Sequence, residues 1–321
     1  MPAIITHYTY AKEAVIDKTN PFLPALYVGA QGPDPFFFYG QRPWARHTGR
    51  KNVNAFGVKL HHMDITDAYF LCLDYASKSS EPELLYSYIE GLFLHYTLDR
   101  NCHPYIFSRA GFAKDEAMKK KLGASHSYFE TILDVLIGKQ NGTFTEHADM
   151  YIKMDDKWTK EISKMWDFVN KLTLKEEMFT DDAFYLSLKD YQKVLRLTNI
   201  PHYGSYLLTL LMGKNSVAHR MNYPRKLKKS LQNLDFLNEN HSVWLDPVTG
   251  KERTESFDDL MKKAEQDYQK VYQILEKIKE NQEGKVELRK FVNNIDHDGF
   301  QPSDEKKFMS PIWPTLDVKK L

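Results

Sequence analysis

Cysteine is scarce in this chain of 321 residues: only Cys72 and Cys102 are present, and neither belongs to a CxxC motif. Two cysteines cannot build the disulfide framework of a small secreted protein, and their scarcity agrees with a reducing compartment. Residues 1–18 mix charged and apolar side chains, so they lack the apolar core of a secretory signal. We therefore expect a cytoplasmic protein.

Neither sign of charge is in excess, because 44 Lys and Arg against 43 Asp and Glu leave a formal net charge of +1. A nucleic-acid-binding surface is usually marked by clustered basic residues, so we expect no stable nucleic acid complex. The chain also has no run approaching the ~20 apolar residues that span a bilayer, which leaves at most a peripheral membrane contact. Its hydrophobic content of 42% is sufficient for a globular core.

Several motifs of metal and phosphate chemistry are missing. The sequence contains no HExxH, no GxxxxGK and no Glu-x-x-His. These absences exclude zincin proteases, P-loop nucleotide hydrolases and carboxylate di-iron bundles of the usual kind.

Helical periodicity, in contrast, is abundant, and strand-like alternation is nearly absent. The pattern is clearest from Ser256 to about Glu283, where Ser256 and Asp259 are typical of a helix start. The sequence therefore predicts an all-α fold, a multi-helix bundle. Further helices are predicted near 58–78, 82–102, 114–138, 155–173, 181–197 and 203–213.

Three stretches are predicted to be irregular. Residues 29–54 are rich in Gly and Pro and are expected to form a long loop, and 215–255 is expected to be a linker with a turn at WLDPVTGK. The tail after Phe300 has three prolines and is expected to be surface coil held by Trp313. We interpret 1–321 as a single domain, with a metal-binding body at 1–214 and a linker, helix and tail at 215–321.

Two histidine and carboxylate pairs suggest a metal site. His95 with Asp99, and His126 with Glu130, are each four residues apart, which places both side chains on one helix face. His103 precedes Pro104, and residues before proline disfavour the helical region, so the helix 82–102 should end there. Imidazole and carboxylate are zinc ligands, and catalytic zinc sites keep one position for water.

Further donors occur upstream, namely His7, Asp34 in a GPDP sequence, and His61, which is followed by His62. The ordered series resembles the zinc-dependent phospholipase C family, whose all-helical fold is shared with single-strand-specific zinc nucleases. The resemblance covers roughly the first 135 residues. The matching residues are His7, Asp34, His61, His95, Asp99, His103, His126 and Glu130.

The resemblance implies a cluster of zinc ions that hydrolyses phosphate esters. In the family one ion corresponds to Asp34, His61, His95 and Asp99, a second to His103, His126 and Glu130, and a third to His7. Asp99 matches a carboxylate that bridges two metals, and Asp34 matches the proposed general base. The family's third ion also uses the amino group of an N-terminal tryptophan, whereas this chain begins Met1-Pro2-Ala3, so we expect two or three ions.

Some residues keep two interpretations. His62 is favoured as a neighbour of the ligand His61, although the two could exchange roles. Arg46 and His47 lie in a basic loop that either contacts a substrate phosphate or is simply solvated. The Asp296-His297-Asp298 run contains a His-Asp dyad but lacks a helical context, so we discount it.

The sequence thus favours a phospholipase C-like phosphodiesterase that acts on a small phosphate ester or a phospholipid head group with zinc-activated water. One alternative is a nuclease or nucleotide phosphoesterase on the same fold. Another is a non-catalytic binding protein whose metals only brace the helices. Imidazole and carboxylate donors also accept iron or manganese, so zinc rests on the resemblance.

Overall fold

The computed structural model describes residues 4–41, 47–122, 125–144, 147–198, 231–281 and 284–313. In these residues the chain is mostly helical, as the sequence predicts, and the antiparallel strands β1 (Trp244–Leu245) and β2 (Glu252–Arg253) are two residues each. No helix in the described ranges is both long and apolar enough to cross a membrane. The helices are α1 (Ile4–Ala14), α2 (Leu23–Gly29), the 3-10 helix η1 (Asp34–Phe38), α3 (Arg50–His61), α4 (Ile65–Ala76), α5 (Pro82–Ala110), α6 (Glu116–Leu122), α7 (Ser125–Gln140), the 3-10 helix η2 (Ala148–Ile152), α8 (Asp156–Leu172), α9 (Ala183–Thr198), α12 (Phe257–Asn281) and α13 (Gly284–Val292).

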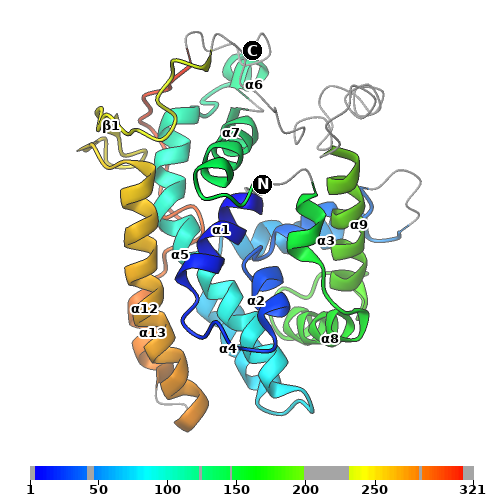
Figure 1. The fold of residues 1–321 in the computed structure, drawn as a ribbon. Helices are drawn as coiled ribbons and strands as arrows, with labels where there is room; N and C mark the ends of the chain where they lie inside the picture. The colour runs from blue at the N-terminus through cyan, green and yellow to red at the C-terminus, as the bar shows by residue number, and fades with distance from the viewer. Residues whose placement is uncertain are drawn as a thin grey trace.

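Helix α5 runs through the middle of the molecule (Figure 1) and is buried along most of its length. Helices α1, α2, α4, α7, α8 and α12 all pack against it. Where α2 crosses α5, a Cβ on Gly29 or Gly91 would overlap the backbone of the other helix. Glycine at both positions therefore lets the two backbones touch, and the chain that leaves α2 toward Asp34 stays close to α5.

The predicted end of this helix at residue 102 is wrong, because α5 continues through Pro104 to Ala110. Proline removes one backbone hydrogen bond, here the one to the carbonyl of Arg100. Gly299 packs against that carbonyl and the Pro104 ring, so tightly that a Cβ would overlap the oxygen. Packing along the buried helix thus outweighs the local preference for a break, and His103 lies inside α5.

Several other predicted boundaries need correction. The helix expected over 58–78 is two helices, α3 and α4, and the second is capped by Asp64, which accepts the Thr66 N–H at 2.9 Å. The helix expected over 114–138 is likewise α6 and α7. The long loop expected over 29–54 contains η1 and the start of α3. Helices α8 and α9 match their predicted ranges, while 203–213 lies outside the described residues.

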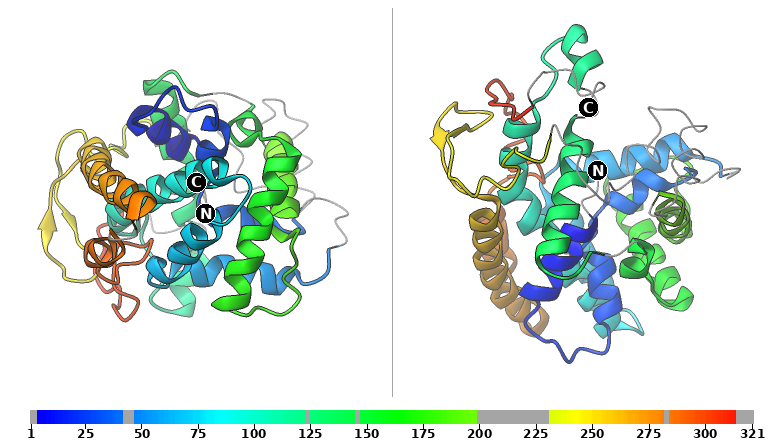
Figure 2. Two further views of the ribbon diagram at one scale, coloured as in Figure 1. Left: turned by 90° about the horizontal axis from the view of Figure 1, so that it is seen from below. Right: turned by 45° about the horizontal axis from the view of Figure 1, so that its top comes forward.

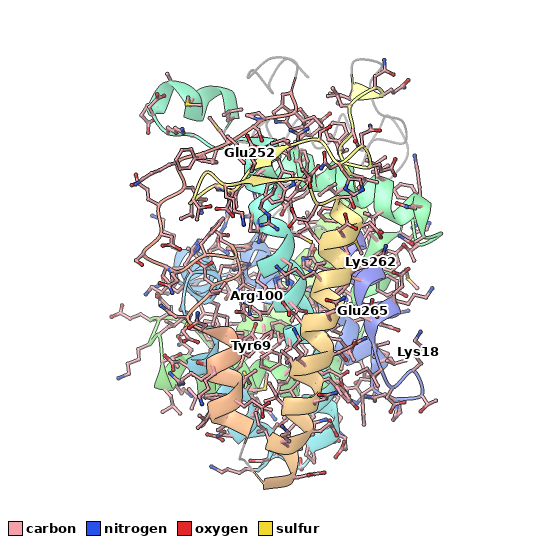
Figure 3. All side chains as sticks on the ribbon, turned by 90° about the vertical axis from the view of Figure 1, so that its left-hand side faces the viewer. Lys18, Tyr69, Arg100, Glu252, Lys262 and Glu265 are labelled. Atoms are coloured by element: carbon pink, nitrogen blue, oxygen red, sulfur yellow. The ribbon has the colours of Figure 1, made fainter. Side chains whose placement is uncertain are left out.

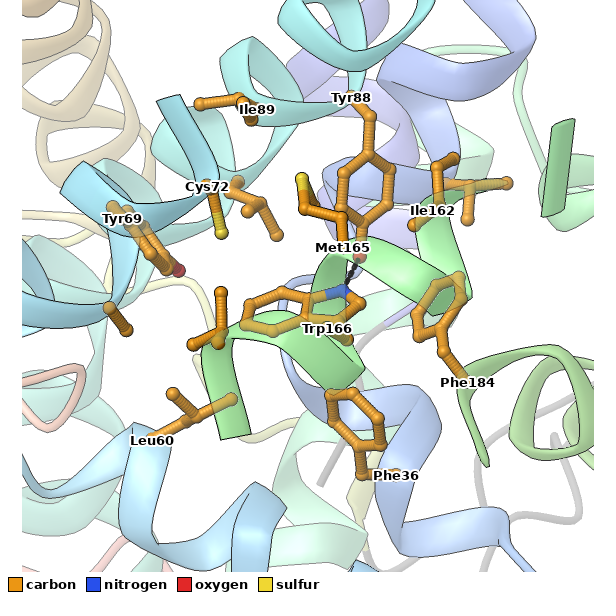
Figure 4. Close-up of a cluster of buried hydrophobic side chains, with 14 of the residues drawn as sticks. Phe36, Leu60, Tyr69, Cys72, Tyr88, Ile89, Ile162, Met165, Trp166 and Phe184 are labelled. Carbon is orange, nitrogen blue, oxygen red and sulfur yellow. Dashed lines mark hydrogen bonds between the residues drawn. The ribbon is translucent and has the colours of Figure 1, made fainter. Parts of the chain in front are cut away.

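Two groups of buried apolar side chains hold α5 from different sides. The first joins residues of η1, α3, α4, α8 and α9; Figure 4 shows Trp166 at its centre, with its Nε1–H donated to the Tyr88 hydroxyl at 2.8 Å. The second joins α1, α5, α7 and α12 and includes Tyr105 and Phe129. Polar residues in the buried middle of α5 therefore need partners from neighbouring elements rather than from water.

The C-terminal part returns to this helical body. Helix α12 lies along α5, and α13 packs beside α12 (Figures 1 and 3). The predicted start is confirmed, because Ser256 and Asp259 exchange hydrogen bonds at the N-terminus of α12. The predicted turn joins β1 to β2. The tail runs as coil beside the end of α5 (Figure 2), and buried Trp313 donates to the Ala110 carbonyl at 2.7 Å, as expected.

Candidate metal centre

His95, Asp99 and His103 form one stripe on the middle of α5, because each is four residues from the next. Their residues are only 1%, 5% and 7% exposed. His95 Nε2 lies 2.9 Å from Asp99 Oδ2, and His103 Nε2 lies 3.8 Å from Asp99 Oδ1. Asp99 is therefore flanked by two imidazoles of its own helix.

A second stripe on α7 faces the first. His126 Nε2 is 3.1 Å from Glu130 Oε1, and the same oxygen is 3.5 Å from His103 Nε2 on α5. Glu130 is buried, whereas the side chain of His126 is 26% exposed. The His126 edge is thus the more solvent-accessible side of the centre.

Asp134, the next residue of the α7 stripe, fixes α1 in place. Its carboxylate accepts the N–H of Ile5 at 3.1 Å and the N–H of Thr6 at 2.8 Å. These N–H groups belong to the first turn of α1 and have no partner within the helix, so the carboxylate caps it. One consequence is the position of His7: its Nε2 lies 3.2 Å from Asp99 Oδ1, and its ring stacks on His95 at 4.3 Å.

Asp34 at the start of η1 and His61 at the end of α3 complete the arrangement. The chain turns at Gly32, which has φ +56°, and a Cβ there would overlap the His95 ring. This turn delivers Asp34 to the start of η1, where its Oδ1 is 3.1 Å from His61 Nε2 at the end of α3. Glycine is needed at residue 32 both for its backbone angle and for its lack of a side chain.

All eight predicted ligands are thereby brought into three groups. Within each group, the potential ligand atoms lie within 4.8 Å of one another. His95 belongs to two of them, and Asp99 Oδ1 lies 3.8 Å from His103 Nε2 of the third, so the groups are contiguous. Each group could hold a metal ion. They are His7, His95 and Asp99; Asp34, His61 and His95; and His103, His126 and Glu130.

Three histidines are oriented by backbone carbonyls. The Nδ1 of His61 is 2.7 Å from the Gly57 oxygen, that of His95 is 3.2 Å from the Ala30 oxygen, and that of His103 is 2.6 Å from the His297 oxygen. Because a carbonyl only accepts, Nδ1 carries the proton in each ring. The Nε2 atoms, which face carboxylates, are then the nitrogens available to a metal, an arrangement common around metal-binding histidines.

Unpaired polar atoms in the centre test whether a metal fits these residues. The buried atoms His7 Nδ1, His95 Nε2 and His126 Nδ1 have no hydrogen-bond partner among the described residues. Burial lowers the pKa of His95, which favours the neutral ring, and in that form the Nε2 lone pair faces Asp99 Oδ2 at 2.9 Å. Two electron-rich atoms that face each other in a buried site are stabilised by a cation, so the residues fit a metal ion.

The electrostatics of the centre keep its carboxylates charged. Burial acts to raise the pKa of Asp99, but the charges of His103, His95 and His7 outweigh it and hold that pKa well below the usual range. For His103, burial acts to lower the pKa, while Asp99 and Glu130 raise it to about 10. The metal-free centre therefore binds protons where a bound cation would otherwise supply positive charge.

His61 and His62 have different surroundings, which their adjacency in the sequence does not reveal. His61 ends the buried face of α3, whereas the side chain of His62 is 52% exposed. His62 Nδ1 lies 3.6 Å from Asp296 and 3.8 Å from Asp298, and these three residues form a further group of possible ligands. Lys306 already pairs with Asp298 at 2.7 Å, so positive charge is present there without a metal.

The two possible phosphate contacts are only partly described. Arg46 lies outside the described residues, and His47 has its Nε2 3.0 Å from Asp190 on α9. Asp190 also accepts the Gly40 N–H at 2.8 Å. These contacts attach the loop of His47 to α9, and the role of His47 toward a phosphate stays a prediction.

His297 is the residue of the centre that the sequence did not indicate. Its ring is fully buried, with centroids 5.1 Å from His61 and 5.4 Å from His95. The backbone N–H of His297 donates to the His61 carbonyl at 3.2 Å, and its backbone carbonyl accepts from Nδ1 of His103. The 296–298 run, discounted as a metal-binding dyad, supports the ligands through its backbone. Only the adjacent His-Asp dyad gave any signal in the sequence.

Comparisons of the chain with models of known protein families, with characterised proteins and with solved structures found no match.

Proposed function

We propose that this chain is a zinc-dependent hydrolase of phosphate esters, a phospholipase C-like phosphodiesterase that uses metal-activated water. The observation that carries the proposal is the convergence of eight histidines and carboxylates, from the four helices α1, α3, α5 and α7 and the 3-10 helix η1, into contiguous and largely buried groups. Burying carboxylates and neutral imidazoles costs free energy unless a cation or a proton lies between them. So many of them in one place therefore favour a metal centre over side chains that only pack the core.

The three groups described above would hold the ions, with His95 shared between two of them and Asp99 in contact with histidines of two groups. Bound divalent ions lower the pKa of water toward neutrality and neutralise charge on phosphate oxygens. Asp34 is a buried carboxylate whose Oδ1 faces His61, and its role is to orient the attacking water and accept its proton. The carbonyls of Gly57, Ala30 and His297 keep three imidazoles in the required tautomer.

The substrate that we propose is a small phosphate ester or a phospholipid head group, and the proposed location is the cytoplasm. A near-neutral net charge gives long polyanions little attraction, which is why a nuclease is the second choice. Turnover of single-stranded nucleic acid without turnover of a phosphocholine ester would reverse this order.

The direct test uses protein purified without chelator or histidine tag. Elemental analysis should find two or three zinc ions per chain, and hydrolysis of bis-p-nitrophenyl phosphate should stop on chelation and return with added zinc. Folded, metal-free protein that binds no added zinc would contradict the proposal. Bound zinc without turnover on any phosphate ester would instead support the non-catalytic alternative.

A further inference from the structure

Tyr191 on α9 has a hydroxyl group that nothing in the described fold uses. The residue is fully buried, and its ring stacks on Phe38 with centroids 3.9 Å apart. The hydroxyl has no hydrogen-bond partner among the described residues. Its presence is therefore not explained by a contact with the described residues.

Other buried tyrosines of the described chain do have partners. The hydroxyl of Tyr88 accepts from Trp166, that of Tyr105 donates to the Phe236 carbonyl at 2.8 Å, and that of Tyr96 donates to the Ile295 carbonyl at 2.8 Å. Burying a hydroxyl without a partner costs free energy that a phenylalanine would avoid. The unpaired hydroxyl of Tyr191 is thus an exception among the buried tyrosines that the structure describes.

One ring contact and one electrostatic effect relate Tyr191 to the metal centre. Its stacking partner Phe38 ends η1, the short helix that begins with Asp34. Burial raises the pKa of Tyr191 well above its usual value, and the carboxylates that raise it further are Asp34, Asp134 and Glu130. Two of these belong to α7 and one to η1, and α9 itself packs on η1, so the charges that act on this hydroxyl are those in and beside the metal centre.

We propose that Tyr191 donates a hydrogen bond to a phosphoryl oxygen of the substrate in the metal centre, an inference that rests on the proposed function. The centre is rich in acceptors, since Asp34, Asp99 and Glu130 are all carboxylates, and an anionic substrate needs donors. A phenol is protonated at neutral pH, so it donates without adding charge. Hydrogen bonds to an anionic oxygen are stronger than neutral ones, particularly in a buried site.

The test compares Tyr191→Phe with Tyr88→Phe, which removes a hydroxyl that is paired and serves the core. For each variant we would measure zinc content, thermal unfolding, kcat and KM on bis-p-nitrophenyl phosphate, and the stabilisation by inorganic phosphate. Tyr191→Phe should keep its zinc, unfold at the same or a higher temperature, lose about 100-fold in kcat, and show a smaller phosphate-induced shift. Tyr88→Phe should unfold at a lower temperature and keep its turnover.

The outcomes separate this inference from the proposed function. If the wild-type protein hydrolyses the ester and Tyr191→Phe matches it in kcat and in the phosphate shift, the Tyr191 inference is wrong while the hydrolase stands. A lower unfolding temperature of Tyr191→Phe with normal kcat would also overturn it, because the hydroxyl would then be structural. If zinc-loaded wild-type protein is inactive, the hydrolase proposal fails; a phosphate shift that depends on Tyr191 would still support the binding role, and its absence would overturn that too.

Discussion

Glu90 and Asp99 are two carboxylates on the same helix, both at least nine-tenths buried, and their surroundings affect them in opposite ways. Burial raises the pKa of Glu90, and its close partner is the neutral hydroxyl of Tyr268 on α12. Asp99 is surrounded by three histidines, which hold its pKa well below the usual range despite burial. One region of α5 thus favours the protonated form of its carboxyl group, and the next favours the charged form.

The comparison shows why burial alone does not identify a site. Glu90 has one hydrogen-bonded neighbour that needs no ion, so it serves the packing of α12 against α5. Asp99 has three imidazole neighbours, those of His7, His95 and His103, whereas a structural ion pair needs only one partner. The kind and number of partners, rather than the depth, distinguish a candidate ligand from a structural acid.

The largest expected effect is the difference in zinc content and turnover between two variants, one that removes the carboxylate of Asp99 and one that removes the carboxyl group of Glu90. Asp99→Asn should lose at least one zinc ion per chain, and its turnover should fall by more than the roughly 100-fold that follows loss of an outer partner of a ligand. Glu90→Gln keeps an acceptor for Tyr268 and should retain both zinc and turnover. Elemental analysis and kinetics on the same preparations measure this, and equal metal content in both variants would remove the distinction between the two carboxylates.

A smaller effect is expected where the C-terminal turn supports the α5 stripe. Gly299 has φ +84°, packs on the Arg100 carbonyl, and lies two residues after His297, whose oxygen orients His103. Gly299→Ala should lower stability by about 1–3 kcal/mol through backbone strain and steric overlap, and should weaken zinc binding about 10- to 100-fold.

Gly142→Ala is the matched control, because Gly142 has φ +64° and nothing within 4 Å of an added Cβ. It should cost only about 1–2 kcal/mol and leave zinc affinity unchanged. Denaturant unfolding and a zinc titration against a competing chelator give both quantities. Equal zinc affinities for the two variants would show that the turn does not position His103.

The smallest expected effect is the pH dependence contributed by Glu90. Its pKa in the folded chain is raised above the ordinary value of 4.5, so between these two pKa values the folded state binds more protons than the unfolded state. Stability contributed by Glu90 is therefore full below pH 4.5 and falls as the pH rises through the raised pKa. Glu90→Gln should be as stable as the wild type in acid and more stable at neutral pH; a constant difference across this range would contradict the raised pKa.

The sequence predicts the helical stripes better than their supports. Residues four apart on a helix share a face whatever the tertiary structure, so the pairing of His95 with Asp99 and of His126 with Glu130 could be predicted locally. Pro104 was misleading because its local preference is overruled by packing on all sides of α5. The carbonyls that orient His61, His95 and His103 carry no residue-specific signal, so no pattern could have indicated them.

Long-range contacts also decide between neighbours that the sequence leaves equal. His61 faces Asp34 while His62 faces Asp296, because the buried face of α3 ends at His61. His297 has no partner at ligand spacing and Asp134 has no histidine four residues away, and their roles depend on contacts with α1 and α5. Such contacts join segments far apart in the chain, where a single sequence contains no record of proximity.

The central claim is that the buried groups around Asp99 hold zinc, and anomalous X-ray scattering at the zinc edge from crystals of chelator-free protein tests it most directly. Our account predicts anomalous peaks among His7, His95 and Asp99, among Asp34, His61 and His95, or among His103, His126 and Glu130, with at least two of these groups occupied. Zinc-supplemented crystals with no peak in these groups, or with a peak only beside His62, would contradict it.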